Sequence, residues 1–475
     1  MKNRALSLLP LLALLLILGR AQALELSAGR INPFADNTLT VVSDQPGLLT
    51  IHVPGYMDAV TGLAIDVGTT ELTWRALSWN DEPLTQGLIR LTAELTLDDG
   101  TVQTAFKQVR IRQARSVVRY CLPEHSSWVI GGASLRVEVG VNFICREHIE
   151  LVSVREGSEP VWVWNGQSPG DKTIHIITWD WGRPKAPLEP GEYVLRAWSF
   201  ACPGQVSEAP VTLTAEEDAP QALFLTGSVL PEDPDDDEAV WAAITAPAVV
   251  ATGFEQTKLH ILAQRDRRAE VVADVYHATV ALTVLELFDD GWARVGVWNH
   301  GGGEYTEGYV RQDQLTVVVP NTRYGLVVDK RTQTLRVYEN GRRIGSVRVS
   351  TGLQVSGEHI LHSETRAGAF LVGSRWASFA SEGFTYQYPF RIDGPNLIHQ
   401  VGWRTRSGLA DGLAEQTPLL GTRASHGCIR VDNTPGEGGI NAYWLWTHLA
   451  HNTKVLVIDD PETRHARMDE LGIPY

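Results

Sequence analysis

A cysteine near the C-terminal end of this 475-residue chain lies between two residue types that activate thiols. The stretch reads Ser425-His426-Gly427-Cys428-Ile429-Arg430. A thiol is a strong nucleophile only as the thiolate, and an ordinary pKa of about 8.5 leaves it mostly protonated at neutral pH. A histidine within reach can take the proton. The pattern therefore predicts Cys428 as a nucleophile and His426 as its base.

The neighbours of Cys428 favour acyl transfer. Gly427 lets the backbone approach a ligand closely, and amide N–H groups at this point of the chain can face an oxyanion. On an extended segment Arg430 would project from the same face as Cys428. Arg430 is then predicted to hold a substrate carboxylate through two hydrogen bonds, or else to form a plain ion pair.

Three other uses of Cys428 stay open at this point. The first is an inert buried thiol, since free cysteine is often a core residue. The second is a zinc site with His399 and His426, but no compact fourth ligand is present in the sequence. The third is redox chemistry, which usually needs a Cys-x-x-Cys motif that this chain lacks. We therefore predict neither a metal nor an organic cofactor.

The hexapeptide resembles the active-site signature of the L,D-transpeptidase family. Three further segments resemble family elements in the same order along the chain, namely Val349-Ser350-Thr351-Gly352, Thr365-Arg366-Ala367-Gly368-Ala369-Phe370 and Ile398-His399. The resemblance covers residues 324–460. It implies a β-rich catalytic domain in which a peptidoglycan stem tetrapeptide acylates Cys428 and loses its terminal D-Ala. An amine on a second stem peptide then attacks the thioester.

The resemblance also implies roles for single residues. His426 matches the usual base, and His399 matches a histidine of the same cleft that shares this role, with bracing of a loop as the alternative. Gly427 and Cys428 would offer oxyanion donors, while Ser425 would brace the loop beside the substrate. Tyr386 and Tyr388 are candidates for lining the cleft, and Tyr388 is our candidate for a substrate contact, although alternate aromatic residues on a strand are more often core.

Three features depart from the family pattern. Arg366 stands where proline is usual, and Gln400 stands where glycine or a small residue is usual. The distance from His399 to Cys428 is longer than usual, and the added segment, 404–417, is predicted to form a lid or side loop. Such a lid would alter substrate choice, so a carboxypeptidase or a crosslink-cleaving hydrolase on the same site is the first alternative. A non-catalytic wall-binding scaffold is the second.

The rest of the chain reads as a series of small β domains. At roughly 100–150 residues per domain, the length predicts three or four of them. Short alternating apolar runs separated by turn residues predict a mainly β fold with two Ig/fibronectin-like β-sandwiches, an SH3-like barrel and the β-rich catalytic domain. We expect the following order: signal peptide 1–23, β-sandwich 24–113, β-sandwich 114–215, acidic linker 216–249, SH3-like domain 250–318, catalytic domain 324–460 and tail 461–475.

The SH3-like prediction is itself a resemblance. Asp289-Asp290-Gly291-Trp292 and Gly308-Tyr309-Val310 resemble the segments that bracket the last strands of bacterial SH3-like domains. This implies a wall-binding or spacing role, and a plain β spacer is the alternative. The expected strands are Val271–Tyr276, Val280–Leu287 and Trp292–Trp298. The acidic run 231–238 is expected to stay solvated, because clustered like charges with proline do not bury themselves. A calcium site there is the alternative.

In the catalytic domain, Asn340-Gly341 predicts a tight hairpin. Residues 439–449 are predicted to form a helix, and the charged tail is expected to form a short helix or to fray.

The N-terminus and the cysteines indicate export. Lys2 and Arg4 precede an apolar run, and Ala21-Gln22-Ala23 is a typical cleavage site, so we expect a periplasmic or cell-wall protein without a transmembrane segment after cleavage. In an oxidising compartment two of the first three cysteines should pair. We predict a Cys145–Cys202 disulfide, because each follows a strand-like run whose end could lie at the same pole of a sandwich.

The net charge of the chain limits which classes of partner are expected. The net charge is −15 and the sequence shows no basic cluster, so a nucleic-acid partner is not expected. Peptidoglycan stem peptides are the expected partner. The oligomeric state is left open.

Overall fold

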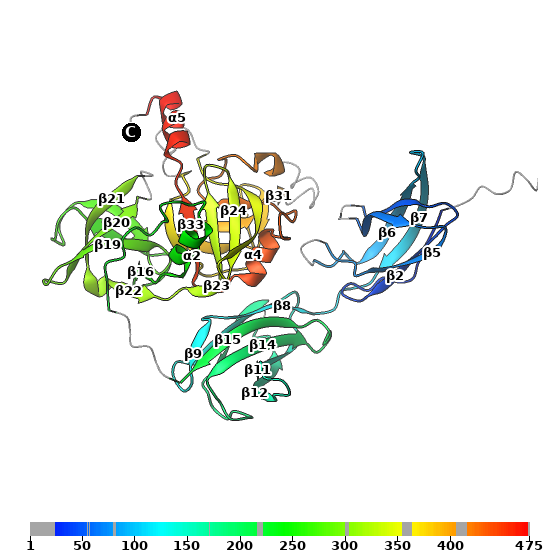
Figure 1. The fold of residues 1–475 in the computed structure, drawn as a ribbon, viewed down its shortest axis with the longest axis horizontal. Helices are drawn as coiled ribbons and strands as arrows, with labels where there is room; N and C mark the ends of the chain where they lie inside the picture. The colour runs from blue at the N-terminus through cyan, green and yellow to red at the C-terminus, as the bar shows by residue number, and fades with distance from the viewer. Residues whose placement is uncertain are drawn as a thin grey trace, which may run out of the picture. The chain divides into compact units, whose positions relative to one another are not determined.

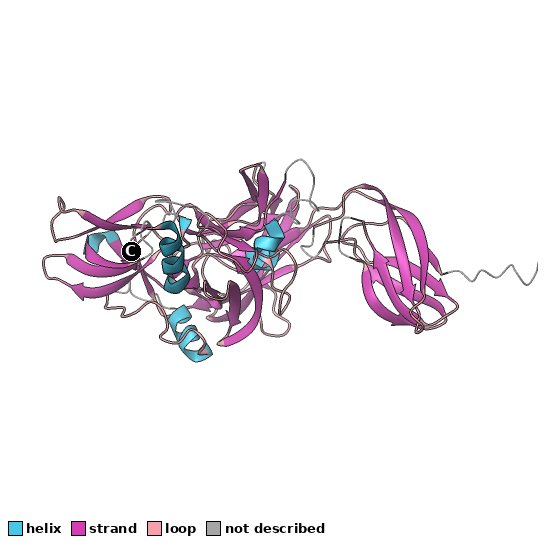
Figure 2. Cartoon of the chain, turned by 90° about the horizontal axis from the view of Figure 1, so that it is seen from above, coloured by secondary structure: helices cyan, strands magenta, loops and turns pink. Residues whose placement is uncertain are grey.

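The computed structural model describes residues 24–473, except 55, 57, 79–81, 171, 216–221, 300–303, 354–362 and 405–415. The predicted signal peptide lies outside the described residues. Strands dominate the chain and helices are few (Figure 2), which confirms the predicted mainly β class. The chain divides into two compact units, Met1–Arg115 and Ser116–Tyr475. In the described residues, no helix is both long and apolar enough to cross a bilayer.

The first unit consists of two antiparallel sheets around one core. Alternate residues such as Leu39 and Val41 on one sheet, and Leu91, Ala93 and Leu95 on the other, are buried, which is the period-two pattern of strands with one face on a core. The sheets are β1-β2-β5 and β4-β3-β6-β7. The bounds are β1 Glu25–Ala28, β2 Asn37–Ser43, β3 Gly47–His52, β4 Val60–Ile65, β5 Gly68–Trp74, β6 Gly87–Thr96 and β7 Val102–Ile111.

The second unit begins with a sandwich of a three-stranded sheet, β13-β10-β8, and a five-stranded sheet, β12-β11-β14-β15-β9 (Figure 1). Trp162 and Trp179 stack in its core with ring centroids 5.4 Å apart. The bounds are β8 Val118–Pro123, β9 Ser127–Val129, β10 Leu135–Val141, β11 Arg146–Ser153, β12 Pro160–Gln167, β13 Ile174–Trp179, β14 Gly191–Ser199 and β15 Ser207–Thr214.

The predicted Cys145–Cys202 disulfide is wrong in this structure. Both residues are free cysteines, as are Cys121 and Cys428. Strand β11 pairs with β14 so that Glu147 lies opposite Ser199, and extending this register places Cys145 opposite residue 201. Cys202 has already entered the turn after β14, where its amide donates to the Ser199 carbonyl. The two strand ends do meet, but the register separates the two side chains.

The predicted acidic linker contains a helix. Helix α2, Asp237–Thr245, begins after Asp236, whose carboxylate accepts hydrogen bonds from the first amides of the helix, as at other N-caps. Its Val240 and Ile244 are fully buried. The run 231–238 contains no buried residue, as expected. The linker prediction missed the helix that follows it, because Val240 and Ile244 are two apolar positions one helical turn apart.

Acidic residues around α2 contact the last domain of the chain. Arg336 donates to Asp235 at 3.1 Å, and the Tyr338 hydroxyl donates to Asp237 at 2.8 Å.

Residues 248–318 form a seven-stranded sheet in the order β18-β17-β21-β20-β19-β16-β22. Its core includes Val249, Ile261, Val275, Val284 and Val295, all fully buried. The bounds are β16 Ala248–Ala251, β17 Lys258–Leu262, β18 Val271–Tyr276, β19 Ala281–Leu287, β20 Trp292–Trp298, β21 Tyr305–Arg311, η1 Gln312–Gln314 and β22 Leu315–Val318.

An eight-stranded mixed sheet forms the scaffold of the last domain, in the order β26-β33-β23-β24-β25-β32-β30-β29, beside a small sheet β27-β28-β31. The bounds are β23 Asn321–Asp329, β24 Thr334–Glu339, β25 Arg342–Ser350, β26 Gly368–Leu371, β27 Ser378–Ser381, β28 Phe384–Gln387, β29 Phe390–Asp393, β30 Asn396–Gln400, β31 Trp403–Arg404, η4 Thr417–Leu419, β32 Ile429–Val431, α4 Ala442–His448, β33 Thr453–Ile458 and α5 Pro461–Leu471. Helix α4 confirms the predicted helix, and the tail forms α5.

The sandwich of the second unit shares a core with this domain. Tyr120 of β8 packs edge-on against Trp446 of α4, with ring centroids 4.8 Å apart. Arg375, 7% exposed, spans the same junction. Its Nε lies 2.7 Å from Glu138 Oε1 of the sandwich, and its other nitrogens donate to the Trp446 and Leu449 carbonyls. The two domains are therefore joined by a buried charge as well as by apolar packing.

Candidate active site

Three strands bring the separate sequence motifs together. Strand β32, which begins one residue after Cys428, lies between β25 and β30. It pairs in parallel with β30, so that His399 lies beside Arg430, and it is antiparallel to β25, so that Ser350 also lies beside Arg430. Because paired residues share a face and faces alternate along a strand, His399 projects on the same side as Cys428.

His399 is held as a neutral base. Only 2% of the residue is exposed, and burial lowers its pKa to about 3, with a further lowering by the charge of Arg430. Its Nδ1 lies 2.7 Å from the carbonyl oxygen of Gln400. That oxygen can only accept, so Nδ1 carries the proton and Nε2 keeps its lone pair. Tyr386 packs edge-on against the ring at 4.7 Å and fixes its plane.

Cys428 itself is half-buried. Burial raises the pKa of its thiol, and this is opposed by the backbone of Leu397 and by the charges of Arg430 and Arg391. At neutral pH the resting residue is therefore a thiol, which makes a nearby proton acceptor necessary for attack.

The loop before Cys428 is fixed by hydrogen bonds on both sides. The Ser425 amide donates to the Thr351 carbonyl at 3.0 Å, and the Ser425 hydroxyl donates to the Cys428 carbonyl. The Thr365 hydroxyl donates to the Gly427 carbonyl at 2.8 Å and accepts from the Gly352 amide at 2.7 Å. The three motifs noted in the sequence thus brace one another, and Ser425, which is fully buried, braces the loop without being open to substrate.

Gly427 is a position where a side chain cannot fit. Its φ is +115°, and a Cβ atom there would lie 2.4 Å from Asn396 Oδ1. We expect Gly427→Ala to destabilise the domain by about 1–3 kcal/mol from backbone strain alone and to slow acylation of Cys428. Thermal unfolding and intact-protein mass would measure the two effects. Gly204→Ala is the matched control, since a Cβ atom at Gly204 would meet no other atom within 4 Å. The prediction would be contradicted if the two variants had the same unfolding temperature and the same rate of Cys428 acylation.

The structure does not bring all predicted residues to the site. His426 is exposed, with 44% of its side chain accessible, and its ring lies 3.9 Å from the Glu382 carboxylate. In the described part of the chain, no hydrogen bond joins it to Cys428. Tyr388 is 1% exposed and packs against Tyr443 and Trp446, so the predicted substrate contact is corrected to a core position.

Arg430 is 6% exposed, and its Nη1 donates to the Ala424 carbonyl at 3.1 Å. It therefore braces the loop and adds positive charge beside the thiol.

Several residues of the site could not be identified from the sequence. Tyr386 is a predicted cleft residue, together with Tyr388, and its ring packs against His399. Asn396 and Arg391 carry no signal because neither belongs to a recognisable motif. Glu364 lies just before the Thr365 segment but stands alone in the sequence. The alternation of Tyr386 with Tyr388 is a usable signal, but alternate residues of a strand share a face, and the sequence does not show that β28 ends at Gln387 and that Tyr388 turns away at a φ of +57°.

Two of the three departures from the family pattern are buried. Arg366 Nε lies 3.3 Å from Asp393 Oδ2, and both side chains are almost completely enclosed. Gln400 is fully buried, and its backbone carbonyl accepts the hydrogen bond that orients His399. The side chain of residue 400 takes no part in that hydrogen bond. Of the predicted lid, residues 405–415 lie outside the described residues.

Comparison with known proteins identifies the domain. The L,D-transpeptidase catalytic domain (YkuD) family matches residues 323–457. No curated protein matches the chain. Similar solved structures include a fused Zn-dependent amidase/peptidase/peptidoglycan-binding domain-containing protein from Clostridium acetobutylicum, at 19% identity and TM-score 0.21, over 29% of this chain and 53% of that one.

Two further similar structures are described as L,D-transpeptidases. One, from Xylanimonas cellulosilytica, is 21% identical with a TM-score of 0.22, over 29% of this chain and 61% of that one. The other, from Mycobacterium tuberculosis, is 13% identical with a TM-score of 0.24, over 57% and 91%. All these TM-scores lie below 0.5, so the assignment rests on the family match. Residues 323–457 are an L,D-transpeptidase catalytic domain of the YkuD family.

Proposed function

We propose that this protein is a peptidoglycan L,D-transpeptidase. Cys428 forms a thioester with a stem tetrapeptide and transfers the acyl group to an amine acceptor. The observation that carries the proposal is the placement of His399 on the strand parallel to that of Cys428, with its Nδ1 proton held by the Gln400 carbonyl. This arrangement directs an unprotonated Nε2 toward the face that carries the thiol. We also propose export to the periplasm or cell wall, consistent with the sequence of residues 1–23.

The reaction follows from this arrangement in two stages. His399 Nε2 takes the proton as Cys428 Sγ attacks the peptide carbonyl, and the backbone amide of Cys428 stabilises the oxyanion. The Gly427 amide, also a predicted oxyanion donor, instead donates to Ser425 Oγ at 3.3 Å. The C–N bond then breaks, and the leaving D-Ala amine takes the proton from His399. In the second stage an acceptor amine attacks the thioester carbonyl and gives its proton to His399. The C–S bond breaks, and Sγ recovers that proton.

The cationic surroundings support the same mechanism. Arg430 and Arg391 both favour the thiolate as it forms, which offsets the cost of creating a charge in a buried position. A contact between Arg430 and a substrate carboxylate stays a prediction. His426, being exposed, is assigned to the rim of the site, where it can contact substrate or stabilise charge without being the principal base.

Intact-protein mass spectrometry tests the proposal. The reduced, folded chain is incubated with a disaccharide-tetrapeptide or a carbapenem, beside Cys428→Ala. We expect the acyl mass on the wild type only. With a diamino acceptor added, a crosslinked product supports transfer, whereas release of the tripeptide to water alone supports the hydrolase alternative. Absence of an adduct on the folded wild type would favour the non-catalytic scaffold.

A further inference from the structure

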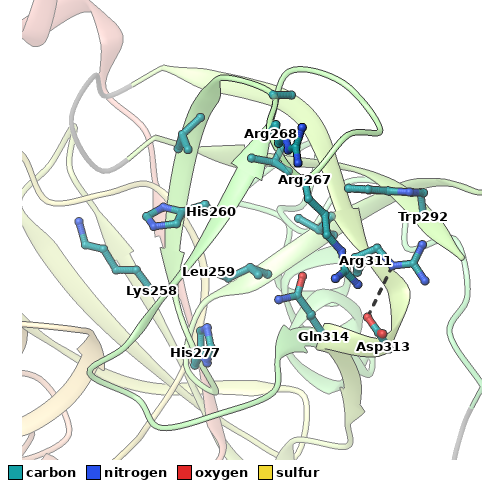
Figure 3. Close-up of a pocket in the computed structure, with 14 residues that line it drawn as sticks. Lys258, Leu259, His260, Arg267, Arg268, His277, Trp292, Arg311, Asp313 and Gln314 are labelled. Atoms are coloured by element: carbon teal, nitrogen blue, oxygen red, sulfur yellow. Dashed lines mark ion pairs between the residues drawn. The ribbon is translucent and has the colours of Figure 1, made fainter.

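A large open pocket lies on the seven-stranded sheet, outside the catalytic domain (Figure 3). Its volume is about 710 Å³, which falls in the range of sites for small molecules or for a segment of a polymer. Strands β17, β18, β20 and β21, the β17–β18 loop and η1 contribute its walls. The lining is Lys258, Leu259, His260, Leu262, Arg267, Arg268, Ala269, Val271, His277, Trp292, Val310, Arg311, Asp313 and Gln314.

The charge of this lining is opposite in sign to that of the chain. Four of the fourteen residues are lysine or arginine and one is acidic, a surplus of three positive charges on a protein whose net charge is −15. Like charges gathered in one concavity repel one another and raise the local concentration of anions. The surplus therefore favours an anionic ligand that carries more than one charge.

Two of the four cations are free to meet such a ligand. Lys258 is paired with Asp274 at 2.9 Å, and Arg311 lies 3.9 Å from Asp313. Within the described residues, Arg267 and Arg268 have no ion pair and no side-chain hydrogen bond, and both are exposed. They lie next to each other in the loop between β17 and β18, and Figure 3 shows both among the sticks that line the pocket. Guanidinium groups bind phosphate and carboxylate through paired hydrogen bonds.

The remaining polar groups add hydrogen-bond donors. Gln314 presents an amide, and Arg311 is held over the ring of Trp292 with its guanidinium carbon 5.4 Å from the ring centroid. The ring nitrogens of His277 are buried, so this residue contributes to the wall of the pocket and not to its donors.

We propose that this pocket, with Arg267 and Arg268 as its principal ligands, binds a multiply charged oxyanion, carried either on phosphate or on carboxylate groups. The site is separate from Cys428, since its lining comes from residues 258–314. It gives the chain a second binding function that does not depend on the proposed acyl transfer.

Calorimetric titration of the full chain tests this site with two probes, pyrophosphate for phosphate and citrate for carboxylate. The variant is the double replacement Arg267→Gln and Arg268→Gln, which keeps polar side chains at two exposed positions. We expect wild-type binding of at least one probe to weaken by about tenfold or more in this variant, as for the loss of charge-assisted hydrogen bonds. The probe that binds shows whether the ligand carries its charge on phosphate or on carboxylate groups.

Arg294→Gln is the matched control. Arg294 belongs to the same sheet but pairs with Glu307 at 2.9 Å and does not line the pocket. Its replacement should leave probe binding unchanged, and thermal unfolding should show that both variants are folded. The proposal is overturned if the wild type binds neither probe, or if the double variant binds as tightly as the wild type does.

Discussion

Replacing His399 by alanine is expected to slow acylation of Cys428 by about 10²–10⁴-fold, the usual contribution of a positioned general base. The reason is that burial raises the pKa of the Cys428 thiol. At neutral pH few molecules therefore hold a thiolate. Among the described residues, His399 is the buried histidine on the strand paired with that of Cys428, so its loss removes the expected proton acceptor. The measurement is the rate of adduct formation with a carbapenem, followed by intact mass at several times.

The pH dependence provides a sharper form of the same prediction. Because burial lowers the pKa of His399 to about 3, the ring is neutral at any ordinary pH, and the wild-type rate should change little between about pH 5 and 8. In His399→Ala the reaction must pass through the small thiolate fraction. That fraction rises about tenfold per pH unit below the thiol pKa, so the variant should speed up steadily as the pH increases.

His426→Ala is the control for this experiment, because His426 is the histidine that the sequence motif favours as the base. Its side chain is 44% exposed and 3.9 Å from Glu382, so its replacement should slow acylation far less than that of His399. If His426→Ala slowed acylation more than His399→Ala did, and if its acylation rate rose more steeply with pH, the assignment of the base to His399 would be wrong.

The second large effect is expected from Glu364→Gln. One oxygen of this fully enclosed carboxylate lies 2.7 Å from Lys330 Nζ, 2.7 Å from Arg423 Nη2 and 3.0 Å from Arg464 Nη1. Removing its charge leaves three buried cations with two carboxylates, those of Asp459 and Asp460, as their remaining partners. A cost of about 3–5 kcal/mol is typical when one partner of a buried ion pair is lost. Thermal unfolding of the full chain should therefore show an earlier transition.

The same substitution should slow acylation at temperatures where the variant is still folded. Arg423 precedes the catalytic loop by two residues and also donates to the Gly352 carbonyl at 3.3 Å, so Glu364 positions the loop through Arg423. Glu437→Gln is the control, because Glu437 pairs with Arg343 on the exposed surface and salt and water screen that pair. An unchanged unfolding transition in Glu364→Gln would show that the cluster does not hold the loop.

Local sequence signals predicted much of the fold. Val271–Tyr276 and Trp292–Trp298 are strands β18 and β20 with the expected bounds. Asn340 and Gly341 adopt φ values of +50° and +79°, as the tight hairpin requires. In each case the information lies in a few adjacent residues, namely alternating apolar positions or a turn pair.

What could not be predicted depends on register and on packing between distant segments. The position of Cys202 relative to Cys145 is decided by a shift of one residue. Tyr388 lies just past the end of β28 at a φ of +57°, so it does not share the face of Tyr386 as two alternate residues of one strand would. Helix α2 is stabilised by burial of Val240 and Ile244 in another domain, which a view of its acidic composition could not show. The choice of His399 over His426 needed the pairing of β30 with β32, two strands separated by a long segment of chain.

The junction between the sandwich and the catalytic domain has a consequence for how this gene can change. Tyr120 and Glu138 belong to the sandwich, yet their partners Trp446 and Arg375 belong to the L,D-transpeptidase domain. Recombination that exchanged one domain without the other would leave a buried arginine without its carboxylate and an aromatic pocket unfilled. The two domains should therefore be inherited together. Substitutions at the junction in β8 or β10 should be under the same selection as substitutions in the core of the L,D-transpeptidase domain.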